Sequence, residues 1–116
     1  MRTEEFNRDD VLNALRRHIG AANGATAATL VREIMGAGGV EAHSERQLRH
    51  ILVALRLEGF HVCAHPTTGI FMAATPDELN DTCQFLYSRA MTSLTQIARM
   101  KNLALPDLAG QLRLRT

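Results

Sequence analysis

The chain has 116 residues, which fits one domain and is too short for two domains of ordinary size. Hydrophobic residues make up 46% of it and charged residues 22%, a composition that excludes an intrinsically disordered chain. No apolar run approaches the roughly 18 residues of a membrane span. The formal net charge is only +1, so charge by itself favours no class of partner. Aromatic residues are scarce at 4%, which favours helices over a large sheet.

The first residues and the cysteines indicate a cellular compartment. Residues 1–5 are polar and contain no hydrophobic signal segment, so secretion is not expected. Two cysteines, Cys63 and Cys83, do not make a disulfide framework. We therefore expect reduced thiols and a cytoplasmic protein.

The first helix has a clear beginning. Asn7 is a suitable N-cap, and Phe6 before it can pack on Val11 one turn into the helix. Apolar residues recur at helical spacing as far as Ile19, and Gly20 is a natural end. A first helix from residue 8 to about residue 19 follows from this pattern.

A second helix is expected from Thr26 to Gly36. One face of it is apolar, with Leu30, Val31 and Ile34. The glycine-rich residues 36–39 cannot continue the helix, so we expect a loop there, with Val40 turned inward.

The third helix is expected to begin at Ser44, because Ser44 followed by Gln47 matches a capping box. Gly59 ends it. Its buried stripe is predicted to contain Leu48, Ile51, Leu52 and Leu55.

Two short strands and a long helix complete the chain. The strands are expected at residues 60–64 and 70–74, joined by a turn with Pro and Gly, with Val62 and Met72 pointing inward. Thr75 to Glu78 form another capping box, which opens a helix from Pro76 to about Lys101. Pro106 allows one short C-terminal helix after it.

Three helices followed by a β-hairpin is the order of a winged helix-turn-helix. Residues 44–59, followed by Val62 and residues 69–72, resemble the recognition helix and wing of small winged helix proteins. Residues 75–79 and the Ser88-Arg89 pair are similar to prophage-encoded members of that group. The connection between the second and third helices, residues 36–43, is longer than the usual turn.

This resemblance implies a mainly α (α+β) fold, with three helices, a two-stranded wing and a long C-terminal helix. It places the winged helix domain at residues 1–74 and a helical extension, packed on the same domain, at residues 75–116. It implies a protein that binds double-stranded DNA as a transcriptional regulator or a replication accessory of the phage or prophage type. The alternative is a winged helix adaptor that binds another protein through the same surfaces.

The third helix carries the candidate DNA contacts. At 100° per residue, Arg46, Arg49, His50 and Val53 fall opposite the buried stripe. Arginine matches guanine edges and phosphates, and free N–H groups near Ser44 suit a phosphate oxygen. The full set of expected contacts is Ser44, Arg46, Gln47, Arg49, His50, Val53, Arg56, Thr67 and Thr68.

Other chemistry is not expected. His61, Cys63 and His65 alternate along one strand, but a fourth metal ligand such as His43 or His50 has no assigned place, so we expect no metal and no cofactor. The glycines at 36–39 lack the Lys and Ser/Thr of a P-loop, and the acidic pairs in the first turns are explained by helix capping. We therefore expect no enzyme.

The long helix has an unusually wide apolar arc. One stripe contains Leu79, Cys83, Leu86, Ala90 and Ile97, and a neighbouring stripe contains Tyr87, Met91, Leu94 and Ala98. Together the stripes are wider than one side of a small domain needs. A homodimer is expected, with contacts from Leu86, Tyr87, Ala90, Met91 and Leu94. The alternative is that residues 103–112 fold back and cover the extra width.

Overall fold

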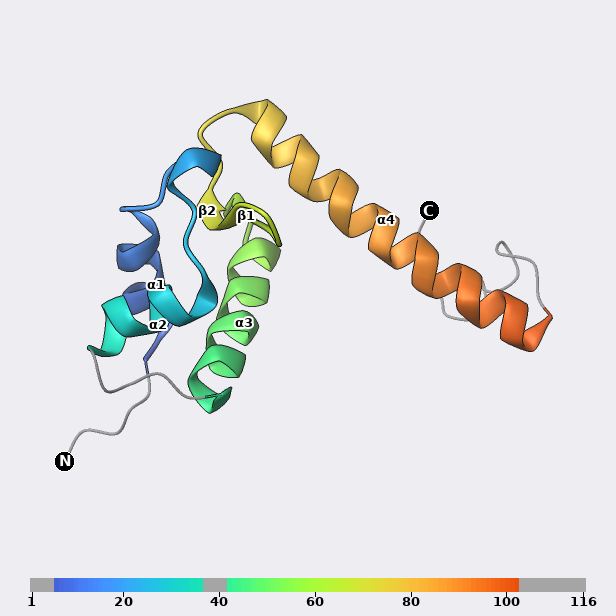
Figure 1. Ribbon diagram of the computed structural model, residues 1–116, viewed down its shortest axis with the longest axis horizontal. Coiled ribbons are helices and arrows are strands. Elements are labelled where there is room, and N and C mark those ends of the chain that lie inside the picture. The colour runs from blue at the N-terminus through green and yellow to red at the C-terminus, as the bar shows by residue number, and fades with distance from the viewer. Residues whose placement is uncertain (1–5, 37–41, 103–116) are drawn as a thin grey trace. The chain divides into compact units, whose positions relative to one another are not determined.

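The structure is a computed structural model that describes residues 6–36 and 42–102. It is mainly helical with a small antiparallel sheet, as the composition predicts (Figure 1). The elements in chain order are α1 (Arg8–Leu15), the short 3-10 helix η1 (Ala21–Asn23), α2 (Ala27–Met35), α3 (Ala42–Leu57), β1 (Val62–His65), β2 (Gly69–Met72) and α4 (Pro76–Lys101). The chain divides into two compact units, residues 1–82 and 83–116, so the boundary falls inside α4.

The start of α1 is capped as predicted. The Asn7 side chain accepts a hydrogen bond from the Asp10 N–H at 2.9 Å, and the Asp10 carboxylate accepts one from the Asn7 N–H at 3.0 Å. This exchange satisfies two backbone donors that have no partner inside the helix. Phe6 and Val11 are both buried in the core.

The end of α1 differs from the prediction. The helix stops at Leu15, and Ile19 is 44% exposed, so Ile19 does not belong to the buried helical stripe. Beyond Leu15 the chain runs beside β2. The Met72 N–H donates to the His18 carbonyl oxygen, and the Gly20 N–H donates to the Met72 carbonyl oxygen, both at 2.8 Å. Pairing with a distant strand therefore replaces the last turn of the helix.

The sheet is a β1–β2 hairpin with a second partner for β2. Within the hairpin Val62 pairs with Met72 and His65 with Gly69. On the other edge of β2, Ala25 and Ile70 exchange two backbone hydrogen bonds of 2.9 and 2.7 Å. The segment around residues 19–25 thus lies along β2 and satisfies backbone groups that an edge strand would leave open.

Helix α2 has the predicted bounds. The Thr26 hydroxyl accepts a hydrogen bond from the Thr29 N–H at 3.0 Å, and Gly36 ends the helix with a φ of 90°. Leu30 and Val31 are fully buried. Gly36 is the first residue of the predicted 36–39 loop; its other residues, 37–39, and the position of Val40 lie outside the described residues.

The predicted start of α3 is wrong. The helix begins at Ala42, so Ser44 lies inside its first turn and cannot be its N-cap. Ser44 is buried, at 2% exposure. Gln47 does not complete a capping box, because its side-chain amide donates to the Phe6 carbonyl oxygen at 3.0 Å. Gln47, which resembled half of a capping box, instead joins the interior of α3 to Phe6, two residues before α1.

The end of α3 is set by Gly59, as predicted. The Phe60 N–H donates to the Leu55 carbonyl oxygen and the Gly59 N–H to that of Arg56, at 3.0 and 2.9 Å. This is a Schellman ending, which requires positive φ after the helix, and Gly59 has a φ of 102°.

The core of the first unit lies between the three helices and the hairpin (Figure 1). Leu48, Leu52 and Leu55 of the predicted stripe are buried, while Ile51 is half-buried. Val62 is buried and Met72 half-buried, as expected for the inward face of the hairpin. The buried core residues are Phe6, Val11, Ala14, Leu15, Ala25, Ala27, Leu30, Val31, Leu48, Leu52, Leu55, Val62 and Ile70.

The first turn of α4 covers the opposite face of the hairpin. Cys63 is fully buried there, with its sulfur 3.6 Å from the Glu78 carbonyl oxygen. The predicted bounds of α4 are confirmed, and the Thr75 hydroxyl accepts from the Glu78 N–H at 3.2 Å. The predicted short helix after Pro106 lies outside the described residues. Among the helices described, none is long and apolar enough to cross a membrane.

Glu78 reaches further than a cap requires. Its carboxylate accepts hydrogen bonds from the Ala74 N–H at 2.8 Å and from the Ala21 N–H at 3.0 Å. The hydrogen bond from Ala21 lowers the pKa of the Glu78 carboxyl most, and the bond from Ala74 lowers it further, so this pKa lies below its usual value. One side chain thus joins the start of α4 to the end of the hairpin and to η1.

Candidate nucleic-acid interface

Helix α3 has one face in the core and one face in solvent. Leu48 and Leu55 are fully buried on the inner face. The side chains expected on the outer face, Arg46, Arg49, His50 and Val53, are all exposed. Helical periodicity therefore located the exposed face of α3 correctly, even though the start of the helix was misplaced.

The two arginines on this face are available to a ligand. Arg46 makes no hydrogen bond or ion pair with any residue in the described part of the chain. Arg49 approaches Glu45 one turn earlier at 4.0 Å, and its side chain is 65% exposed. An exposed pair at that distance contributes little, so Arg49 can leave Glu45 for a phosphate or a guanine edge at small cost.

Three of the residues on α3 expected to contact DNA are instead buried or hydrogen-bonded within the protein. Ser44 is buried and Gln47 is bonded to the Phe6 carbonyl oxygen. Arg56 is half-buried and donates from Nε to the Val62 carbonyl oxygen at 2.9 Å. Arg56 thus fixes the start of the hairpin against the end of α3. We leave these three residues out of the interface.

The tip of the hairpin offers less than expected. Thr67 is exposed, but the Thr68 hydroxyl oxygen is enclosed and has no hydrogen-bond partner in the described part of the molecule. Gly24 lies directly against this turn: a Cβ on Gly24 would be only 1.8 Å from the Thr68 carbonyl oxygen. Of the two threonines, Thr67 is therefore the one that can face a partner.

Besides the small Ala54, two exposed residues on α3 were not among the expected contacts. His43 lies in the first turn, three residues before Arg46, and Leu57 in the last turn is 84% exposed. Both continue the helical spacing of the outer face, which is the signal that identifies them. The outer face is therefore cationic toward the N-terminus and apolar at Val53 and Leu57 toward the C-terminus.

The three residues weighed as metal ligands have different surroundings. His61 and His65 are exposed, whereas the Cys63 thiol is buried against backbone carbonyl oxygens. His65 also accepts a hydrogen bond from the Thr67 N–H at 3.1 Å. Within residues 6–36 and 42–102, no group of three or more His, Cys, Asp or Glu side chains could hold a metal ion.

The apolar arc of α4 is unevenly exposed. Tyr87 is 61% and Leu86 40% exposed, and Ala90 is exposed as well. Met91 and Leu94 are half-buried. The suggestion that residues 103–112 cover this arc lies outside the described residues.

No model of a known family, no curated protein and no solved structure matches the chain. The outer face of α3 is the part of the first unit where exposed cations gather on one regular element, and it is the candidate site.

Proposed function

We propose that the chain is a winged helix protein that binds double-stranded DNA through the outer face of α3. The observation that carries this proposal is the exposure of Arg46, Arg49 and His50 on one side of a helix whose other side is core. A recognition helix needs this division, with polar side chains toward its N-terminal half.

The order of elements supports the fold. Helices α1, α2 and α3 pack together and precede the hairpin, and the chain near Ala25 lies along β2 as a third strand-like segment. Between α2 and α3 the connection has six residues, Gly36 to Glu41, which is longer than a standard helix-turn-helix turn. The resemblance of residues 75–79 and of the Ser88-Arg89 pair to prophage-encoded winged helix proteins is the basis for proposing a transcriptional regulator or a replication accessory, and no match to a known protein adds to it.

The chemistry assigns a role to each side chain. Arg46 and Arg49 bind guanine edges in the major groove or the flanking phosphates, because a guanidinium donates two parallel hydrogen bonds to either. His50 adds a weaker polar contact, and Val53 can meet a thymine methyl group. Arg56 holds the hairpin in position and does not itself contact DNA.

A binding titration tests the proposal. We expect labelled duplexes to bind at low salt, with affinity that falls steeply as salt rises, because phosphate contacts release counterions. Arg46→Ala should cost about 1–3 kcal/mol of binding free energy if Arg46 contacts a base edge. Arg16→Ala, which removes an exposed charge at the end of α1, is the matched control. Unchanged anisotropy curves for Arg46→Ala, Arg49→Ala and the double variant would reject the proposal.

A protein-binding adaptor is the second candidate, and one observation favours it. Val53 is 51% and Leu57 84% exposed on the same helix, and exposed apolar side chains in a row often mark a protein interface. In this case the chain would show no salt-dependent affinity for any duplex. Leu57→Glu would leave DNA affinity unaffected if α3 docks by its N-terminal half, and would abolish the adaptor's partner binding.

The proposal includes a homodimer formed through α4. Leu86, Tyr87 and Ala90 are exposed on one side of the helix, and a two-fold axis lets the same patch serve both subunits. Two copies of α3 could then engage two half-sites of one DNA site.

A further inference from the structure

Charge is unevenly divided along this chain. Residues 1–82 contain eight arginines against eleven acidic residues, whereas residues 83–116 contain four arginines and Lys101 against Asp107 alone. The first unit therefore carries −3 and the second +4, which together give the net +1 of the chain. At long range a net-negative first unit is repelled by DNA, so the excess positive charge of the second unit is the part of the chain that favours non-specific attraction to DNA.

The polar side of α4 has a composition that suits phosphate. Phe85, Ser88, Arg89, Thr92 and Ser93 line one shallow hollow on this helix. Gln96 and Arg99 continue the same side by helical spacing, and all these residues except Phe85 are exposed. No acidic residue occurs from Thr82 to Asn102. Hydroxyl, amide and guanidinium groups are the donors that proteins use for the nucleic-acid backbone.

Arg89 is held in place on this side. Its guanidinium lies over the Phe85 ring, 5.8 Å from the ring centre. Stacking on an aromatic face restricts the guanidinium plane while its N–H donors stay available to a ligand. Ser88 and Thr92, which carry hydroxyl groups, line the same hollow as Arg89, so a phosphate bound there has several kinds of donor around it.

We propose that this side of α4, the α4 polar face (Phe85, Ser88, Arg89, Thr92, Ser93, Gln96 and Arg99), binds the phosphate backbone of duplex DNA. The inference rests on the proposed function in taking DNA as the partner. It differs in assigning the sequence-independent part of the affinity to α4, while α3 supplies contacts to bases.

The placement of the arginines favours DNA over a membrane surface. Arg89 and Leu94 are five residues apart, which is about 140° around a helix, and Arg99 likewise falls opposite the apolar arc. A helix lying on a bilayer by that arc would direct both arginines away from the lipid headgroups. A partner on the α4 polar face meets both of them.

The test compares full-length variants on a labelled duplex of arbitrary sequence. In Arg89→Gln/Arg99→Gln we expect affinity at low salt to fall about tenfold, and the plot of log affinity against log salt to become shallower by about 1.8, for two lost phosphate contacts. Glutamine keeps the helix propensity of arginine, and both positions are exposed, so circular dichroism should be unchanged.

The matched control is Arg16→Gln/Arg32→Gln, which removes two exposed charges from the first unit. It should leave the salt dependence nearly unchanged. If both double variants change the slope equally, α4 has no special part and the inference is wrong. It is also wrong if Arg89→Gln/Arg99→Gln loses binding to phosphatidylserine vesicles, or changes the mass of the protein in light scattering, while its DNA affinity stays that of the wild type.

The inference and the proposed function can fail separately. Loss of affinity in the α4 variant with no effect of Arg46→Ala and Arg49→Ala would retain the α4 site and reject base contacts by α3. The reverse result would reject only the α4 site. A wild-type chain that binds no duplex at low salt would reject both.

Discussion

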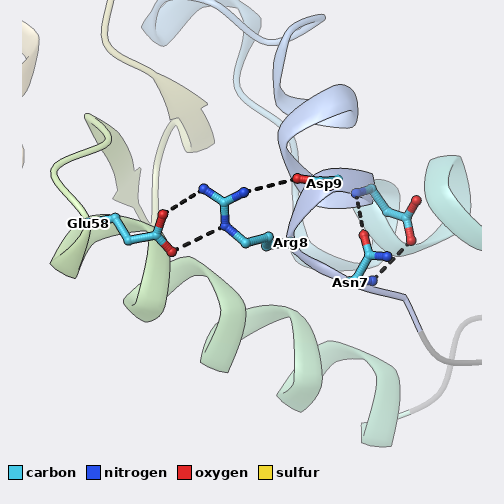
Figure 2. Close-up of polar contacts among 5 residues, drawn as sticks. Asn7, Arg8, Asp9 and Glu58 are labelled. Carbon is cyan, nitrogen blue, oxygen red and sulfur yellow. Dashed lines mark hydrogen bonds and ion pairs between the residues drawn. The ribbon is translucent and has the colours of Figure 1, made fainter.

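Arg8 and Glu58 form a two-pronged ion pair that joins the start of α1 to the end of α3 (Figure 2). The distances are 2.6 Å from Nη2 to Oε1 and 3.2 Å from Nε to Oε2. Arg8 also contacts the Asp9 carboxylate at 3.0 Å and lies over the Phe60 ring, 5.6 Å from its centre. The hydrogen bond with Glu58 raises the pKa of the Arg8 guanidinium above its usual value. The pair orients the helix that we propose to bind DNA.

Removing Arg8 should therefore cost more stability than removing the charge of Glu58. Arg8→Ala loses the ion pair, the contact with Asp9 and the packing on Phe60, whereas Glu58→Gln keeps one hydrogen-bond acceptor. We expect the urea midpoints of both variants to be lower than that of wild type, and that of Arg8→Ala to be the lower of the two. In high salt the midpoints of the variants should move closer to that of wild type, because salt screens the ion pair. Equal effects in the two variants would show that the ion pair alone accounts for the role of Arg8.

Gly24 should be intolerant of any side chain. Its Cβ would lie 1.8 Å from the Thr68 carbonyl oxygen and 2.9 Å from the carbonyl carbon, so the hairpin tip must move. We expect Gly24→Ala to lower the free energy of unfolding by about 1–3 kcal/mol. Because the added Cβ would clash with the Thr68 backbone and not with its side chain, the double variant Gly24→Ala/Thr68→Ala should not regain the lost stability. Denaturation curves of the two variants check this, and a Gly24→Ala midpoint equal to wild type would contradict it.

The elements that were predicted correctly depend on local signals. Asn7, Thr26 and Thr75 each cap the helix that follows them, and a cap needs only residues within one turn. The end of α1 was missed because it depends on pairing with Met72, which is far along the chain. Ser44 was misread for a related reason, since Gln47 three residues later bonds to Phe6 and not to a cap.

The same distinction holds for the candidate site. Periodicity alone placed Arg46 and Arg49 on the outer face, because one face of an amphipathic helix is determined by its own sequence. Arg56 and Thr68 could not be assigned in this way. The Arg56 side chain donates a hydrogen bond to the Val62 carbonyl oxygen, and the segment at Gly24 packs against Thr68. In both cases a distant part of the fold determines whether the side chain is available to a partner.

Glu78 should make the stability of the first unit depend on pH. Its carboxylate accepts hydrogen bonds from Ala21 and Ala74, and its pKa lies below the ordinary value of 4.5. A group with a lowered folded-state pKa contributes stability above its unfolded pKa and loses it as pH falls through the folded one. The contribution is therefore complete at neutral pH and disappears in the acid range below 4.5.

The measurement is the urea midpoint of wild type and Glu78→Gln between neutral and acidic pH. We expect Glu78→Gln to be less stable at pH 7, and the two curves to converge as pH falls. Asp77→Asn removes a charge from the same helical turn without these two hydrogen bonds and serves as the control. A constant difference between wild type and Glu78→Gln across this range would show that the ionised carboxylate is not what stabilises the junction.

Dimerisation through α4 is tested most directly at Tyr87. This side chain is 61% exposed beside Leu86, whereas Met91 and Leu94 are half-buried, so a charge at Tyr87 disturbs the monomer least. Soluble monomers rarely leave such contiguous apolar groups in water without a use for them. A carboxylate in the centre of a two-fold contact is repelled by its own copy and is deprived of water, so it opposes association twice.

We expect the wild type to have the mass of a dimer by light scattering at tens of micromolar, and Tyr87→Glu to have that of a monomer with an unchanged circular dichroism spectrum. Thr92→Glu places the same charge on the opposite side of α4 and should remain dimeric, which separates loss of the contact from loss of the helix. A wild type that is monomeric at this concentration would exclude the α4 dimer. A Tyr87→Glu variant that is still dimeric would place the contact on another surface, of which the exposed Val53 and Leu57 on α3 are the first to examine.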